Sequence, residues 1–408
     1  MSTEIDIIER TLDAMQDNID RLQNGGINCV AYPYERSRSQ FPGMLRRWYL
    51  GIMAGTKVGK SQFTYNTFVF EPLMRLYYGN ENFELNYIIF ALEETYDRVI
   101  QRFMSWLLYR ESRGKINVSP TELRSTLKPC PKEAMDMIKD DHIQDILAFF
   151  RKHVTFPDES PNPTGIYNYC KSWAEERGTV HNTKYESTDE FGEKILKEQF
   201  SHYTPNDPDA FNVVIIDPVN RLDRERGMDE RETMKKLSEY CTKYLRNRYG
   251  FTCIIVQQQS FSAFSTDAAK IRKFEPTVGD GGGSKEISQD LDAQLALYCP
   301  DNFDVDNYSG YDIKKLRKRA LFVRCTINRD GEGGGITPLF FDGRTSQFWE
   351  LPRPTESGKM LSVYNYAEQL RLPHTMEELA ALNPFLKKEQ PKPKNDKVSL
   401  FNLLFHPK

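Results

Sequence analysis

Residues 54–61 of the chain read Ala54-Gly55-Thr56-Lys57-Val58-Gly59-Lys60-Ser61. A stretch of this form is typical of a phosphate-binding loop, in which backbone N–H groups surround the phosphates of a nucleotide. In such a loop Lys60 contacts the β- and γ-phosphates, and the Ser61 hydroxyl binds Mg²⁺. An apolar run of strand length, 48–53, precedes the loop, and a run compatible with a helix, 62–70, follows it. The sequence therefore predicts a site for ATP and Mg²⁺. The alternative is an ordinary glycine-containing turn that binds no nucleotide.

The rest of the chain repeats the rhythm of strands and helices. Further apolar runs of strand length occur at 85–92, 211–216, 251–256 and 321–326, and most are separated by helical or long polar segments. This rhythm is typical of an α/β fold with a parallel sheet. A last pair of runs, at 336–341 and 347–351, flanks Asp342-Gly343-Arg344. We expect a RecA-like P-loop core, with a mainly parallel central sheet flanked by helices and a terminal β-hairpin.

Three parts are expected along the chain. Residues 1–24 form a linker-type helix over 3–22, which Thr3 can cap and Asn24-Gly25-Gly26 ends. Its apolar residues follow a 4-3-4-3 spacing that puts one stripe on the helix: Ile8, Leu12, Met15, Ile19 and Leu22. Residues 25–382 form the ATPase core, with a helical, partly polar segment at about 105–210. Residues 383–408 comprise a Lys/Pro-rich linker, which we expect to be disordered, and an apolar C-terminal peptide.

The composition limits the cellular compartments in which we expect the protein. The 408 residues contain no apolar stretch near the ~20 residues of a membrane span, and the N-terminus lacks the basic start and apolar run of a signal peptide. The seven cysteines are scattered without a C-x-x-C pair, as in a reduced, cytosol-like compartment. We expect a cytoplasmic protein without a membrane partner. The net charge of −3 leaves nucleic-acid binding open, because a narrow channel needs only local basic groups.

Two carboxylates follow predicted strands. Asp217 ends the run 213–216, where it would anchor Mg²⁺ beside the phosphate-binding loop. Glu93 and Glu94 follow the run 87–92, and the carboxylate of Glu93 is assigned to polarise the attacking water. The alternatives are a strand-terminal turn at Asp217-Pro218 and an exposed helix start at Glu93.

Polar residues also follow two other strands. Gln257, Gln258 and Gln259 follow the run 253–256, where a neutral amide can sense the γ-phosphate; position alone does not choose among them. Arg329 lies beyond the run 321–326, where a guanidinium can reach a phosphate in an adjacent subunit, as arginine fingers do. A solvated surface arginine is the alternative.

Two loops are candidates for nucleic-acid contact. The segment 221–227 carries arginines for phosphates, and the segment 279–285 is rich in glycine and allows a close backbone approach. A solvated run of mixed charge and a simple glycine linker are the corresponding alternatives.

Taken in order, these residues resemble the replicative hexameric helicases of the DnaB type and the helicase half of phage primase-helicases. The resemblance covers about residues 20–352. It rests on the phosphate-binding loop and on four stretches in the family's order: Ala91-Leu92-Glu93-Glu94, Val214-Ile215-Ile216-Asp217, Ile255-Val256-Gln257-Gln258 and Ser288-Gln289-Asp290-Leu291-Asp292.

The resemblance implies roles for particular residues. Glu93 would be the catalytic base, Gln258 the sensor, and Arg329, before a glycine turn, the arginine finger that acts on a neighbouring subunit's ATP. The first DNA-binding loop would lie near 224–231, and the second near 281–285. The candidate DNA contacts are therefore Arg224, Arg226, Arg231, Gly281, Gly282, Gly283, Ser284 and Lys285.

Two departures from the family stand out. Ile327 replaces the lysine that usually lies two residues before the arginine finger, and the family's separate N-terminal domain is missing. The latter, with the chain's size, is typical of a phage or mobile-element version, which would act in the cytoplasm of a bacterial host. The implied partners are single-stranded DNA and further copies of the chain in a ring, expected to be a hexamer.

The C-terminal peptide offers one more contact. Residues 399–401, Ser-Leu-Phe, resemble short peptides that bind sliding clamps, although Lys397 and Val398 replace the usual glutamine and leucine. The peptide could bind a primase, a loader or a sliding clamp, or pack back on the ATPase core.

The leading hypothesis is an ATP-dependent replicative DNA helicase. A RecA-like ATPase that binds single strands or remodels a filament without unwinding is one alternative. A nucleotide-gated scaffold that hardly hydrolyses ATP is the other.

Overall fold

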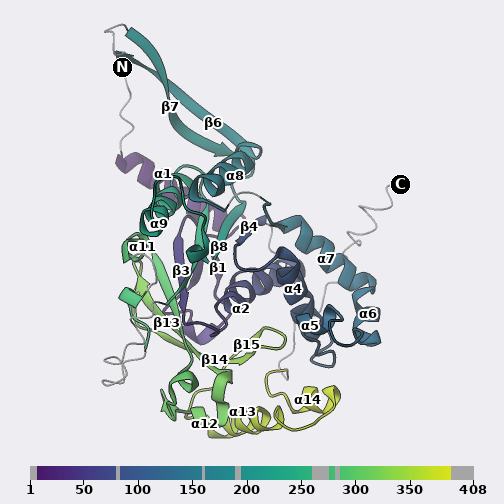
Figure 1. The fold of residues 1–408 in the computed structure, drawn as a ribbon. Coiled ribbons are helices and arrows are strands. Elements are labelled where there is room, and N and C mark those ends of the chain that lie inside the picture. Colours follow the sequence, from purple (N-terminus) through teal and green to yellow (C-terminus); the bar gives the residue numbers. More distant parts are fainter. Residues whose placement is uncertain are drawn as a thin grey trace.

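The computed structural model describes residues 7–79, 83–158, 161–188, 194–259, 275–280 and 285–386. Within these residues the centre of the molecule is a nine-stranded sheet (Figure 1). Its strands, in spatial order, are β15 (Gln347–Glu350), β14 (Ile336–Asp342), β13 (Ala320–Asn328), β10 (Ala293–Tyr298), β3 (Tyr49–Ala54), β9 (Thr252–Gln258), β8 (Phe211–Asp217), β4 (Leu85–Ala91) and β5 (Val154–Thr155).

The strands from β10 to β5 run parallel, whereas β13, β14 and β15 are antiparallel to their neighbours. The expectation of a mainly parallel sheet with a terminal hairpin is thereby confirmed. Strand β13 covers the run 321–326 but is antiparallel to its neighbour. That neighbour is β10, which the sequence patterns did not reveal and which lies between β13 and β3. Strand β10 escaped notice because its six residues directly follow the polar stretch that ends at Asp292.

Helices cover both faces of the sheet (Figure 1). The helices of the described residues are α1 (Ile7–Gln23), α2 (Lys60–Tyr65), α3 (Glu71–Tyr78), α4 (Tyr96–Glu111), α5 (Pro120–Leu123), α6 (Lys132–Ile138), α7 (Asp141–His153), α8 (Pro163–Glu175), α9 (Glu230–Glu239), α11 (Lys285–Asp290), α12 (Ile313–Leu316), α13 (Ser357–Gln369) and α14 (Met376–Leu382). A five-residue π-helix, Asn66–Phe70, joins α2 to α3.

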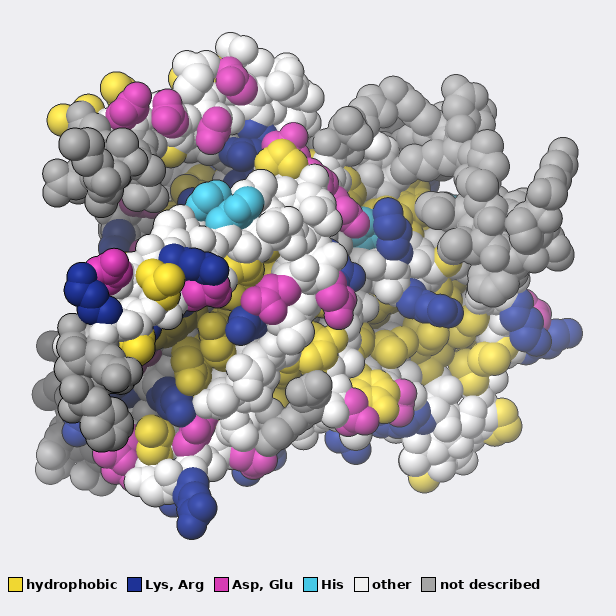
Figure 2. All heavy atoms as spheres, turned by 90° about the horizontal axis from the view of Figure 1, so that it is seen from above, with side chains coloured by type: hydrophobic (Ala, Val, Ile, Leu, Met, Phe, Trp, Pro, Cys, Tyr) yellow, Lys and Arg dark blue, Asp and Glu magenta, His cyan; other side chains and the backbone are white. Residues whose placement is uncertain are grey.

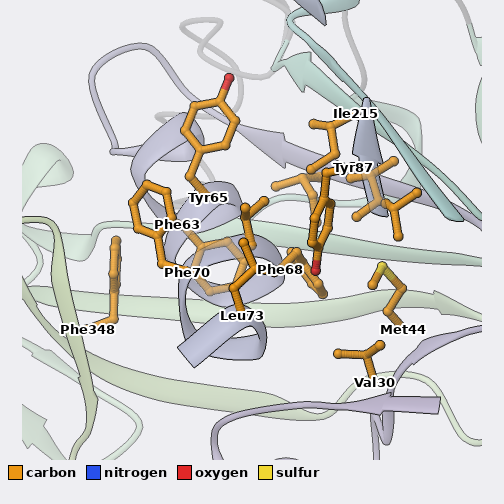
Figure 3. Packing of buried hydrophobic residues seen from close by; sticks show 14 of the residues in the cluster. Val30, Met44, Phe63, Tyr65, Phe68, Phe70, Leu73, Tyr87, Ile215 and Phe348 are labelled. Atoms are coloured by element: carbon orange, nitrogen blue, oxygen red, sulfur yellow. The ribbon is translucent and has the colours of Figure 1, made fainter. Parts of the chain in front are cut away.

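The sheet separates two hydrophobic cores because successive side chains of a strand point to opposite faces. In β8, Val213 and Ile215 join the core under α2, α3, α4 and α7, while Val214 and Ile216 join the core under α8, α9 and α11. Figure 3 shows the first core from close by, where Tyr87 lies beside Ile215 and Phe70 lies near Phe63. A third core packs α12 and α13 against the antiparallel strands.

The expected helical and polar segment at about 105–210 contains α5 to α8 and one long hairpin that the sequence patterns did not predict. Strands β6 (Gly178–Thr188) and β7 (Lys194–Pro205) pair antiparallel and project from the body of the molecule (Figure 1). Most side chains of the hairpin are exposed, so neither strand has the alternation of apolar and polar residues that identifies a half-buried strand. Figure 2 shows acidic and basic side chains interspersed on the face from which the hairpin projects.

Helix α1 begins at Ile7 in the described residues, so the expected cap at Thr3 and the C-terminal peptide both lie outside them. The apolar stripe of α1 is exposed, and Ile8, at its start, keeps 68% of its surface in solvent. Near the other end of the helix, Arg21 forms an ion pair of 3.0 Å with Asp209. Gly25 follows with φ of 82°, a conformation that favours glycine and ends the helix.

Candidate nucleotide-binding site

The predicted phosphate-binding loop connects the end of β3 to the start of α2. Gly59 has φ of 88° and directly precedes Lys60, the first residue of the helix, so the loop's backbone turns in a conformation that glycine permits. A side chain at this position would also meet the ring of Phe341 at 3.1 Å. The geometry places the N-terminal end of a helix, with its free N–H groups and positive dipole end, behind the loop, which is the arrangement that binds phosphates.

Asp217 ends β8 two strands away and is only 3% exposed. Burial raises the pKa of its carboxyl, and the Ser61 hydroxyl and the Lys60 ammonium oppose that rise. The Oδ1 atom of Asp217 is buried without a hydrogen-bond partner. A buried carboxylate oxygen without a partner, beside a serine hydroxyl and a lysine, fits the oxygen ligands that Mg²⁺ prefers. The residues present therefore fit ATP with its magnesium ion.

The two glutamates after β4 have different surroundings. Glu93 Oε2 lies 3.5 Å from Lys60 Nζ, and 51% of the Glu93 side chain is exposed. Glu94 instead accepts two hydrogen bonds, of 2.7 and 2.9 Å, from the guanidinium of Arg102. A carboxylate held by a bidentate arginine is not available to take a proton, whereas Glu93 lies beside the loop and faces solvent.

Of the three glutamines at the end of β9, Gln258 has a side chain that bonds the phosphate-binding loop. Gln258 Nε2 donates a hydrogen bond of 2.6 Å to Thr56 Oγ1. The side chain of Gln257 is fully buried, and the backbone N–H of Gln259 donates to the carbonyl of Ala54. The geometry thus distinguishes Gln258 from its neighbours, which position along the sequence did not.

Arg329 lies at the amino-terminal ends of the parallel strands, whereas the phosphate-binding loop of its own chain follows the carboxyl end of β3. It follows Asn328, whose partner Ala293 pairs in turn with Leu50 near the start of β3, whereas the loop follows Ala54. The four residue steps from Leu50 to Ala54 span about 13 Å of strand. Arg329 therefore lies away from the phosphate-binding loop of its own chain.

The side chain of Arg329 contacts the polar stretch that precedes β10. Its guanidinium donates to the carbonyl of Gln289 and lies 3.7 Å from Asp292 Oδ1, and its backbone N–H donates to the carbonyl of Asp292. Asp292 also accepts hydrogen bonds from the backbone N–H of Tyr49 and from Arg246. The carboxylate of Asp292 therefore connects Arg329 to the start of β3. In the sequence, Asp292 stood out only as part of a stretch that resembles the family.

The candidate DNA contacts lie outside this cluster. The side chains of Arg224, Arg226 and Arg231 are exposed between β8 and the first turn of α9. The loop that carries them is held by Glu225, which accepts from the backbone N–H of Thr164 and from Lys236. Residues 281–284 lie outside the described residues, and the backbone of Lys285 begins α11.

The turn of the terminal hairpin also contacts the helix behind the loop, a contact that sequence reasoning missed. Gln62 Nε2 donates to the carbonyl of Gly343 at 2.9 Å and to Ser346 Oγ at 3.0 Å. On the same turn, Arg344 donates to Glu122. The turn itself was predicted, but its partners lie more than 200 residues away in the sequence, where no local pattern points to them.

No protein-family model matches the chain, and no curated protein matches its sequence. None of the helices in the described ranges is long and apolar enough to cross a membrane. Solved structures are similar in fold. The ATPase domain of one helicase has a TM-score of 0.59 at 15% identity, over 86% of this chain and 100% of that chain. A DnaB-like replicative helicase, in a structure that addresses its interactions with primase, has a TM-score of 0.58 at 16% identity, over 86% of this chain and 69% of that chain. The chain therefore has the RecA-like fold of DnaB-type helicase ATPase domains.

Proposed function

We propose that the protein is an ATP-dependent replicative DNA helicase. In this proposal it forms a ring, expected to be a hexamer, and couples ATP hydrolysis at subunit interfaces to movement along single-stranded DNA. The observation that carries it is the meeting of Lys60, Glu93, Asp217 and Gln258 around one loop, on a fold shared with DnaB-type ATPase domains.

The residues divide the chemistry among them. Lys60 and the backbone of the loop would bind the phosphates. Ser61 and Asp217 would hold a magnesium ion, which would supply positive charge against the phosphates during phosphoryl transfer. Glu93 orients the attacking water and accepts its proton, because its carboxylate lies beside Lys60 and faces solvent. Gln258 senses the γ-phosphate, since its amide already contacts Thr56 in the loop.

The proposed ring supplies what one chain lacks. Arg329 lies at the end of the strands away from the phosphate-binding loop of its own chain. We therefore assign it to the ATP of an adjacent subunit. The loops at 224–231 and 281–285 are assigned to DNA, and a primase is a proposed partner by analogy with the DnaB-like neighbour.

Unwinding of a forked DNA duplex with a fluorescent reporter strand tests the proposal. Strand separation should require ATP and Mg²⁺, and single-stranded DNA should raise ATP turnover. The matched control is Lys60→Ala, which should do neither. ATP turnover that rises with single-stranded DNA while the fork stays closed would favour the RecA-like ATPase without unwinding. Negative-stain imaging with an ATP analogue and single-stranded DNA tests the ring independently.

A further inference from the structure

The molecule has an open groove separate from the residues of the nucleotide-binding site. It lies between the end of α4, strand β15 and helices α13 and α14, with a volume of about 1060 Å³. That volume is slightly larger than the roughly 300–1,000 Å³ of typical ligand-binding pockets. None of the proposed catalytic or DNA-binding residues is among its lining residues.

The described chain ends on the rim of this groove. The buried side chain of Asn383 donates a hydrogen bond of 2.8 Å to the hydroxyl of Tyr109 in α4. The ring of Phe385 stacks on that of Trp349, with 5.1 Å between centroids and 4° between planes. Leu386, the last described residue, is itself a lining residue. The tail that follows therefore starts from a fixed point beside the groove.

The tail is long enough to fold back. Residues 387–397 separate this fixed point from the apolar peptide at 398–405. These residues reach up to about 36 Å when fully extended, at roughly 3.3 Å per residue. A short tether gives an effective concentration on the order of millimolar, so even a weak contact within one chain is populated.

The chemistry of the groove suits an uncharged apolar peptide. Several charged side chains that line it already face each other in pairs: Arg36 with Glu350, Arg110 with Glu71, and Lys359 with Glu356. Aromatic and aliphatic surface remains, from residues such as Trp349 and Leu382. The peptide at 398–405 reads Val-Ser-Leu-Phe-Asn-Leu-Leu-Phe and carries no charge. Apolar surface between paired charges is therefore available to a neutral apolar ligand.

We propose that residues 398–405 dock into this groove of their own chain. The peptide buries its apolar side chains against β15, α13 and α14, and it braces the hairpin whose turn contacts Gln62. The inference is independent of the helicase proposal, because it rests on the groove and on the end of the chain.

Photocrosslinking in the full-length protein tests the docking. A photoreactive phenylalanine analogue at position 401 should form adducts with β15, α13 or α14 of the same chain, located by mass spectrometry. The yield of these adducts should not change on dilution, because the contact is intramolecular. Adducts that map outside the groove, only to a second copy, or only to another protein would overturn the proposal.

A matched pair of surface variants separates docking from nonspecific contact. Leu382 lines the groove and is 46% exposed, whereas Leu372 is 52% exposed and does not line it. In the crosslinking protein, Leu382→Asp should abolish the groove adducts, and Leu372→Asp should leave them unchanged. Equal yields in both variants would contradict the assigned site.

Thermal melting provides a second measurement that does not depend on crosslinking. Phe401→Asp in the full-length chain should lower the melting temperature by about 2–4 °C, the shift that a modest loss of packing causes in a large domain. Lys394→Asp in the linker should leave it unchanged. An unchanged melting temperature in Phe401→Asp would show that the peptide does not pack on the core.

Discussion

Gln258 donates a hydrogen bond of 2.6 Å to the hydroxyl of Thr56, which ties the end of β9 to the phosphate-binding loop. Gln258→Ala removes this contact while leaving Lys60 and Asp217 in place. We therefore expect ATP to bind normally and the stimulation of turnover by single-stranded DNA to be lost. Turnover with and without DNA, together with binding of a fluorescent ATP analogue, checks this. Full stimulation in Gln258→Ala would exclude the proposed sensor.

Glu93→Gln should bind ATP and hydrolyse it about 10²–10⁴-fold more slowly, because the amide keeps the shape of the side chain and loses the base. Glu94→Gln is the control, since Glu94 is held by Arg102 and not by the loop. Single-turnover hydrolysis of radiolabelled ATP distinguishes the two variants. Slow hydrolysis in Glu94→Gln and rapid hydrolysis in Glu93→Gln would assign the catalytic base to Glu94 instead.

Lys60→Ala should abolish nucleotide binding or turnover, because the phosphates lose their cationic partner. A filter-binding assay with labelled ATP and a phosphate-release assay measure the two effects. Near-normal ATPase activity in this variant would disprove the assigned site.

Arg329→Ala should reduce turnover, and mixing it with Lys60→Ala chains should restore part of the activity. Restoration is expected because one kind of mixed interface contains both an intact loop and an intact arginine. Turnover measured across a series of mixing ratios tests this. If no ratio restores activity, the contacts of Arg329 with Gln289 and Asp292 have a structural role within the chain.

Deleting residues 1–24 should convert rings into smaller species, because the stripe on α1 remains exposed in the single chain. A helix with exposed apolar residues from Ile8 to Leu22 needs a partner surface, and a neighbouring subunit would provide it. Light scattering gives the mass of the assembly. Replacing Ile8 and Leu12 by serine is the milder variant, and an unchanged mass in both cases would rule out this docking.

The sequence predicts the parts of this fold that follow a local rule. Strands β3, β4, β8 and β9 are apolar runs, and the motif that ends at Ser61 marks the loop between β3 and α2. Glu93 follows β4 and Asp217 ends β8, and these neighbouring strands are parallel. Their carboxyl ends therefore lie at the same side of the sheet, which the sequence could predict. Long-range contacts have no such rule, so the neighbours of Gln62 and the partner of Glu94 became visible only in the structure. The β6–β7 hairpin escaped prediction because most of its side chains are exposed, so neither strand alternates apolar and polar residues.

The base of that hairpin has a consequence for how the chain can vary. Gly178 and Pro205 are paired, so the chain leaves the body and returns to it at the same place. Val180 and Tyr203, near this base, pack on the core, and Tyr203 donates a hydrogen bond to the carbonyl of Ala174 in α8. The part of the hairpin beyond these contacts can therefore change in length without moving the ends of α8 and β8. This outer part behaves as a replaceable module, and it is suited to grafting a tag or a fluorophore.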